Sequence, residues 1–149
     1  MSNSRRTFLI QSVIACSGVI APRLAFADWA EDHFAPGKLD RTLDRLYADA
    51  TIVESDAIAL KLPLIAEDGA VVPITVSSTL GNVESIAILV EKNPVPLAAI
   101  FNIAPETEPF VSAHLKMAET CDVIAVVKSG ETLYSARQQV KVTIGGCGG

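Results

Sequence analysis

The chain has 149 residues, of which 50% are hydrophobic and 19% are charged, and its formal net charge is −5. A chain of this length forms one domain that buries a substantial hydrophobic core. Acidic residues outnumber basic ones and no cluster of Lys and Arg occurs, so we expect neither nucleic acid nor anionic membranes as partners. Three cysteines do not make a disulfide framework.

The chain begins with the pattern of a twin-arginine export signal. Arg5-Arg6 precedes an apolar run over residues 10–21, and Ala25-Phe26-Ala27 supplies a cleavage site of the small-x-small type. This pattern predicts a signal peptide over residues 1–27. The mature protein is then expected to start at Asp28, to lie in the periplasm and to have no membrane segment.

Two other interpretations of this leader exist. A membrane anchor is disfavoured because the apolar run is short and ends at Pro22-Arg23. A lipoprotein cut before Cys16 stays open, since residues 13–16 form a loose lipobox. Removal of the signal would leave nine basic and seventeen acidic residues, a formal charge of −8. Because twin-arginine export carries folded proteins, we also expect a partner subunit that is exported as a passenger.

A short helix is expected near the start of the mature chain. Residues 28–37 are polar and are expected to be poorly ordered, whereas residues 38–50 have helical periodicity. The apolar side chains of this helix share one face, which predicts that it packs on the domain, with partner binding as the alternative. These side chains are Leu39, Leu43, Leu46, Tyr47 and Ala50.

After residue 51 the apolar residues recur with a period of two, and turn signals separate the runs. This rhythm, without helical crossovers, predicts an all-β, antiparallel β-sandwich. Two runs, 86–90 and 123–127, are apolar on both faces and are expected to be central strands. The expected strands cover residues 58–62, 64–66, 71–76, 86–90, 98–104, 111–117, 123–127 and 134–144. The domain is therefore expected to span residues 28–144.

The last five residues, Gly145-Gly146-Cys147-Gly148-Gly149, combine one thiol with four glycines. Glycine loses more conformational entropy than any other residue when it is fixed, so this stretch is expected to be a slender, flexible arm. Gly145, Gly146, Gly148 and Gly149 would supply the flexibility, and Cys147 would carry a group on its sulfur into the clefts of other proteins. The alternative is a disordered end with an inert cysteine.

The remaining residues show no pattern of catalysis or metal binding. His33 and His114 are isolated and are expected at the surface, and no nucleophile–base set or phosphate loop occurs. Cys121 opens a strand of buried character and is expected to be a core residue, with a resolving thiol for Cys147 as the alternative. The chain is therefore expected to use no cofactor and no metal, and to catalyse nothing by itself.

Several of these stretches resemble the SoxY family, the sulfur-substrate carriers of the bacterial sulfur-oxidising (Sox) system. The resemblance rests on the export signal, on residues 64–73 (LIAEDGAVVP), on residues 93–97 (NPVPL), on residues 140–143 (VKVT) and on the Gly-Gly-Cys-Gly-Gly tail. The tail is the most specific of these marks. Cys121 lies outside the family's pattern.

The resemblance implies an immunoglobulin-like sandwich that forms a heterodimer with SoxZ, a β-sandwich subunit without an export signal. It also implies that Cys147 is the covalent attachment site. The cytochrome SoxAX would join thiosulfate to this cysteine, the hydrolase SoxB would release sulfate, and the sulfur dehydrogenase SoxCD would oxidise the remaining sulfane sulfur.

Two functions of other classes remain as alternatives. One is a carrier that ends in Gly-Gly and is converted to a thiocarboxylate, which would have a β-grasp fold and act in the cytoplasm. The other is a periplasmic β-sandwich that serves as an adhesion or scaffold domain. Sulfur adducts on Cys147 would favour the sulfur-substrate carrier. Sulfur in place of a carboxylate oxygen on Gly149 would favour the thiocarboxylate carrier, and neither modification would favour the scaffold domain.

Overall fold

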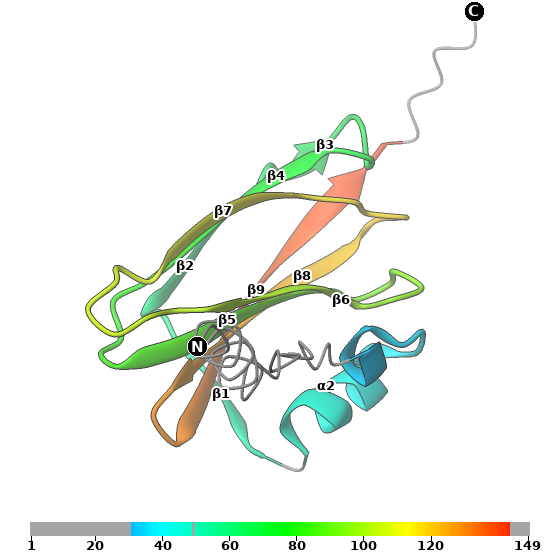
Figure 1. Ribbon diagram of the computed structural model, residues 1–149. Coiled ribbons are helices and arrows are strands. Elements are labelled where there is room, and N and C mark those ends of the chain that lie inside the picture. The colour runs from blue at the N-terminus through cyan, green and yellow to red at the C-terminus, as the bar shows by residue number, and fades with distance from the viewer. Residues whose placement is uncertain (1–30, 49, 144–149) are drawn as a thin grey trace, which may run out of the picture.

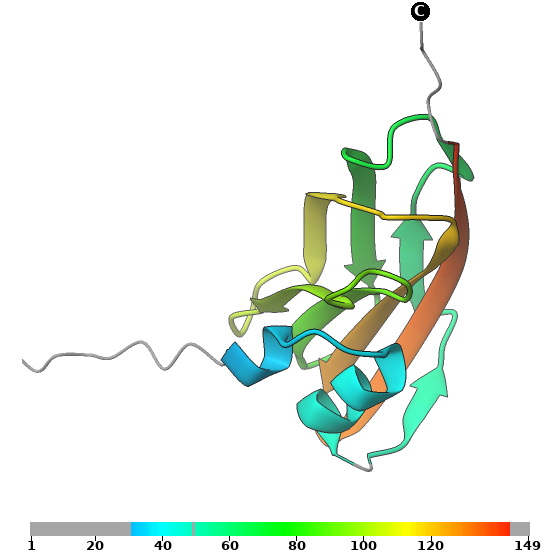
Figure 2. The same cartoon turned by 90° about the vertical axis from the view of Figure 1, so that its right-hand side faces the viewer.

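The computed structural model describes residues 31–48 and 50–143, so the predicted signal over residues 1–27, with Cys16, and the tail from residue 144 lie outside the described residues. The described chain forms two β-sheets packed face to face, with a short helical layer on the outer side of the larger sheet (Figures 1 and 2). The predicted all-β sandwich of immunoglobulin-like type is confirmed.

The helical layer consists of a 3₁₀ helix and one α-helix, followed by nine strands. Their bounds are η1 Glu31–Phe34, α2 Leu39–Tyr47, β1 Ile52–Glu54, β2 Ile58–Lys61, β3 Ile65–Ala66, β4 Val72–Ser78, β5 Val83–Val90, β6 Leu97–Asn102, β7 Phe110–Leu115, β8 Cys121–Ser129 and β9 Thr132–Val142. All the expected strands occur with small shifts of their bounds. Strand β1 was not predicted from the sequence, because it has only three residues and two of them are exposed.

The larger sheet has the strand order β1-β9-β8-β5-β6, and the smaller sheet the order β2-β4-β7. Most pairs are antiparallel, as predicted, but β1 and β3 both pair in parallel with β9. The predicted antiparallel pairing therefore holds for the other strands but not for β1 and β3 at this edge. Two short strands from the first half of the domain share one side of the last strand, which a hairpin pattern does not produce.

The core between the sheets follows from the alternation along the strands. In β4, Val72, Ile74 and Val76 are fully buried, while Pro73 is exposed. In β7, Val111 and Leu115 face inward as predicted, and His114 points outward as expected. The residues of β5 and β8 that face these side chains, Ile86, Ile88, Val90, Val123, Ala125 and Val127, complete this core.

A second core lies on the outer face of the larger sheet, beneath α2. Its buried residues are Ala87, Leu89, Leu97, Ile124, Val126 and Leu133, and the predicted helix face packs on them through Leu39, Leu43, Leu46 and Tyr47. The two runs that are apolar throughout are therefore covered on both faces. The predicted packing role of the helix is confirmed.

The segment before α2 is more ordered than expected. Residues 31–34 form η1, and Phe34 packs against the second core, so the expectation of poor order over residues 28–37 was wrong for the described part. Arg45 explains the difference, because its guanidinium donates to the backbone oxygens of Asp32 and Ala35 at 3.0 and 3.1 Å. Within the described residues, no helix is long and apolar enough to cross a membrane.

Candidate functional site

The end of β9 is held on both sides just before the tail begins. On one side, the amides of Lys141 and Thr143 donate to the carbonyl oxygens of Leu64 and Ala66 at 2.9 and 3.0 Å. On the other side, Thr120 bonds Val142 twice, since its hydroxyl accepts from the Val142 amide at 2.9 Å and donates to the Val142 carbonyl at 3.3 Å. The tail therefore starts from a fixed point.

The turn between β3 and β4 closes tightly over this point. The Met117 amide donates to the carbonyl oxygen of Gly69 at 2.7 Å. A Cβ atom at Gly69 would lie 2.5 Å from the Met117 carbonyl oxygen and 2.9 Å from a methyl carbon of Val142. Only glycine fits at this approach without a shift of the backbone, so the predicted turn over residues 67–69 also braces the end of β9.

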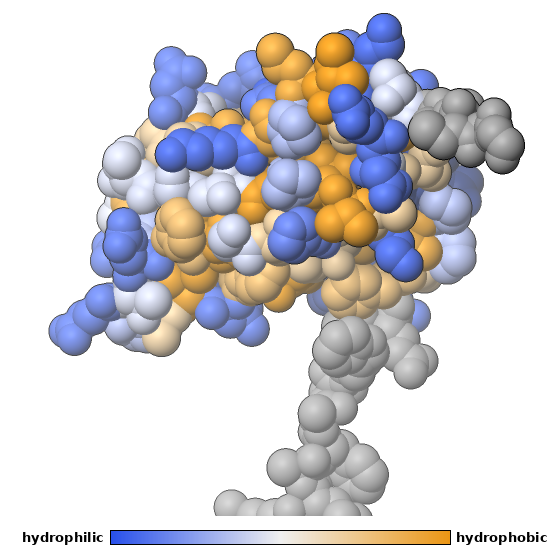
Figure 3. Space-filling view, turned by 90° about the horizontal axis from the view of Figure 1, so that it is seen from above, coloured by the Kyte–Doolittle hydropathy of each residue, from blue (hydrophilic) through white to orange (hydrophobic). Residues whose placement is uncertain are grey.

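Three large apolar side chains are exposed at the same end of the sandwich. Leu64 is 74% exposed, and Ile65 and Val71 are each 56% exposed. Figure 3 looks down on this end and shows apolar side chains standing between hydrophilic ones. We call Leu64, Ile65 and Val71 the root patch. These residues were predicted to lie in strands, but the apolar runs that contain them did not indicate which side chains point to solvent.

Cys121 lies on the inside of this end. Cys121 is 2% exposed, belongs to the core between the sheets and pairs with Val140 of β9. Burial raises the pKa of its thiol above the ordinary value, against the lowering effect of a backbone hydrogen bond from Lys92. The thiol is therefore protonated and inaccessible, and the predicted core role is confirmed.

The other residues singled out from the sequence lie partly inside and partly outside the described part of the chain. Cys147 and the four glycines at positions 145, 146, 148 and 149 lie outside the described residues and stay predictions. His33 is in η1 and His114 is exposed on β7. Among residues 31–48 and 50–143, no group of His, Cys, Asp and Glu side chains could hold a metal ion.

Comparison with known proteins agrees with this architecture. The sulfur carrier protein SoxY from Chlorobium limicola f thiosulfatophilum has a solved structure with 40% sequence identity and a TM-score of 0.66, over 72% of this chain and 97% of that one. The superoxide reductase (neelaredoxin) from Ignicoccus hospitalis matches with 17% identity and a TM-score of 0.54, over 62% of this chain and 94% of that one, which shows a shared fold alone. No match was found among curated proteins.

The family model of the sulfur oxidation protein SoxY matches residues 43–147, which covers the sandwich and extends to Cys147. Together with the structural neighbour, this match supports a carrier role in sulfur oxidation and a place among the partner proteins of the Sox system. The chain belongs to the SoxY family.

Proposed function

We propose that this protein carries thiosulfate-derived intermediates covalently on Cys147, in the periplasm, and presents them to partner enzymes. The β-sandwich and its helical layer, which we call the body, supply a rigid base for the tail and do not themselves catalyse the reactions. The observation that carries the proposal is the family match up to Cys147, combined with a fixed end of β9 at Val142, five residues before that cysteine.

The chemistry of loading is an oxidation that joins two sulfur atoms. The Cys147 thiol loses its proton, its sulfur forms a bond to the outer sulfur of thiosulfate, and two electrons leave to the cytochrome SoxAX. The product is a sulfur–sulfur adduct that ends in a sulfonate group. SoxB would then use one water molecule to release sulfate and leave a sulfane sulfur on the cysteine, which SoxCD would oxidise.

The described residues disfavour Cys121 as the carrier. Cys121 is the one free cysteine of the described part of the chain, and it is buried and has a raised pKa. Thiolates rather than thiols attack sulfur, and access to the attacking atom is required. Cys121 meets neither condition, whereas the resolving-thiol interpretation requires both.

The assembly that we propose is a heterodimer with a SoxZ-like subunit. The twin-arginine signal expected over residues 1–27 would export a folded complex, and a subunit without its own signal would travel as a passenger. The two-sheet sandwich does not favour the thiocarboxylate carrier, for which a β-grasp fold was expected. Purification of the native protein with a small β-sandwich partner would support the heterodimer, and a monomer in the presence of that partner would contradict it.

The test of the carrier residue compares two substitutions. We expect Cys147→Ser to abolish thiosulfate-dependent turnover and to leave folding unchanged, because a hydroxyl cannot form the sulfur–sulfur bond. Cys121→Ala serves as the control and should cost about 1 kcal/mol of stability through lost packing while loading continues. Mass spectrometry of tail peptides should locate the adduct on Cys147. Loss of loading in folded Cys121→Ala protein would contradict the assignment.

A further inference from the structure

We propose that the root patch, formed by Leu64, Ile65 and Val71, is the surface on which the loading enzyme docks, and that its occupant is the apolar rim of that enzyme's active-site opening. This inference rests on the proposed function of Cys147. It adds to that function a recognition surface on the body, separate from the tail that carries the sulfur.

Packing among residues 31–48 and 50–143 does not explain the exposure of the root patch. Ala66, the next residue of β3, is 6% exposed and contributes the core contact of this strand. Val72, the neighbour of Val71, is fully buried in the same way. Leu64, Ile65 and Val71 belong to neither core and expose apolar surface to solvent. Clustered exposed apolar side chains mark interaction sites.

The root patch is attached directly to the start of the tail. The carbonyl oxygen of Leu64 accepts from the amide of Lys141, and Ile65 is the register partner of Lys141 in the parallel pair of β3 with β9. The turn that leads to Val71 passes close to Val142, since a Cβ atom at Gly69 would lie 2.9 Å from a methyl carbon of Val142. Because these links hold the patch and the end of β9 together, a protein that binds the patch also fixes the point from which the tail departs.

The length of the tail limits where a docked enzyme can lie. Cys147 lies four positions after Thr143, the last described residue. A fully extended chain spans about 3.3–3.6 Å per residue, so the Cα atom of Cys147 lies within roughly 14 Å of that of Thr143. An enzyme that encloses the sulfur in a cleft uses part of this length, and its rim then comes to lie against the end of the sandwich. Among the described residues, the root patch offers exposed large apolar side chains at that end.

The charged residues around the patch favour apolar contact over charge as its mode of recognition. Glu67 and Asp68 lie exposed in the turn between Ile65 and Val71, and Lys141 is exposed beside Ile65. Charges of both signs therefore flank the patch. We expect the effect of the patch on binding to persist at high salt, because screening weakens charge pairs between exposed groups and not apolar burial.

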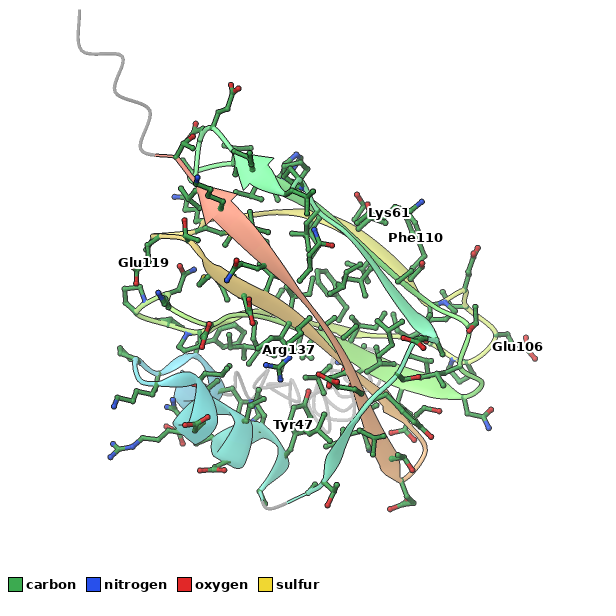
Figure 4. The ribbon with its side chains drawn as sticks, turned by 180° about the vertical axis from the view of Figure 1, so that it is seen from behind. Tyr47, Lys61, Glu106, Phe110, Glu119 and Arg137 are labelled. Carbon is green, nitrogen blue, oxygen red and sulfur yellow. The ribbon has the colours of Figure 1, made fainter. Side chains whose placement is uncertain are left out.

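The experiment compares two matched variants. The patch variant combines Leu64→Gln, Ile65→Thr and Val71→Thr, which replace apolar side chains by polar ones of similar size, and threonine keeps the strand propensity at position 65 in β3. The control combines Phe110→Gln and Val53→Thr, which also remove exposed large apolar side chains. Phe110 pairs with Ser77, five residues along β4 from Val72, so it lies about 16 Å from the patch at roughly 3.3 Å per residue. In Figure 4 it lies well away from the end of β9.

Loading is measured with thiosulfate and the cytochrome that joins it to the carrier, with carrier concentration varied. We expect the patch variant to raise KM about tenfold or more, with kcat nearly retained at saturation, and the control to change KM by less than about twofold. Alkylation of the thiol by iodoacetamide should be equal in all three proteins. This last measurement shows that the thiol itself is unchanged.

The outcomes separate the two proposals. Equal KM values for the patch variant and the wild type, with wild-type loading intact, would overturn the docking surface alone. If the patch variant changes the stoichiometry of the complex in sedimentation experiments, the occupant is a subunit or a second copy of this chain, and the proposal is also wrong. If the wild type is not loaded on Cys147 at all, the proposed function fails and the docking surface with it.

Discussion

The outer faces of the two sheets differ in how they meet their surroundings. On the larger sheet, outward residues such as Leu89 and Val126 are buried beneath α2. On the smaller sheet, the outward residues of β4 and β7 are Pro73, Thr75, Ser77, Phe110, Ser112 and His114, and none of them is buried. In the described part of the chain, no helix packs on this second face (Figure 2). The sandwich thus has a helical layer on one side and ends in a bare sheet on the other.

This difference shows how α2 is retained on the body. The helix has nine residues, a length at which isolated helices are marginal in water. Its stability therefore comes from burying its apolar face on a sheet that is apolar on both sides. The smaller sheet alternates apolar and polar residues, so it offers no second apolar face and needs no cover.

The largest expected effect comes from placing a charge on each outer face. Val126→Asp would bury a carboxylate beneath α2 without a partner, and we expect a loss of about 3–5 kcal/mol or failure to fold. The matched change Ser112→Asp on the bare face should cost less than about 1 kcal/mol, because its carboxylate stays in water. Urea unfolding measures both. Equal losses would show that the two faces do not differ as described.

A smaller effect is expected from trimming the helix face. Leu43→Ala should cost about 1–2 kcal/mol, because Leu43 is a partly buried residue of the second core. Thr75→Ala on the bare face should stay within about 0.5 kcal/mol. Far-ultraviolet circular dichroism during urea unfolding would show whether α2 is lost with the sheet. Loss of the helix signal well before the sheet signal would mean that the second core is a separate unit.

The smallest effect is confined to alkaline pH and concerns Tyr47 of α2, which Figure 4 labels beside the helix. Burial raises the pKa of its hydroxyl from 10.0 to about 12. Because the pKa is raised in the folded state, the folded protein keeps the hydroxyl proton at a pH at which the unfolded chain releases it. The contribution of the protonated hydroxyl of Tyr47 to stability is therefore fully present below pH 10 and is lost as the pH rises from 10 to about 12.

We therefore expect the stability difference between wild type and Tyr47→Phe to be constant below pH 10 and to shift against the wild type above it. The measurement is urea unfolding at a series of alkaline pH values, with tyrosinate absorbance as a direct reading of the ionised hydroxyl. An unchanged difference across this range would mean that the hydroxyl of Tyr47 is in contact with water.

Much of the two-faced character of the larger sheet was visible in the sequence. The uninterrupted runs Ile86–Val90 and Val123–Val127 predicted strands covered on both sides, and the periodic Leu residues of the helix supplied the cover. The local pattern was sufficient to predict burial, because a run that is apolar at every position indicates that both faces of its strand are buried. Cys121 was predicted in the core for the same reason, from its place at the start of such a run.

What sequence reasoning missed depended on partners far along the chain. The parallel pairing of β1 and β3 with β9 joins the first strands of the domain to its last one, and no local pattern encodes it. The order of η1 depends on Arg45, which follows it by more than ten residues. At the candidate site, Leu64-Ile65-Ala66 read as one apolar run, although two of its members face solvent and one faces the core. Cys147 stays a prediction.

The position of β9 has a consequence for synthesis. This last strand pairs with β1, β3 and β8, and its Val140 is fully buried in the central core. A chain emerging from the ribosome cannot close the sandwich until β9 has emerged, since long-range strand pairing must wait for both partners. A nascent chain that stops before residue 132 lacks this strand and stays open to proteases. The sandwich therefore closes, and becomes protected from proteases, only after translation has come within a few residues of Cys147.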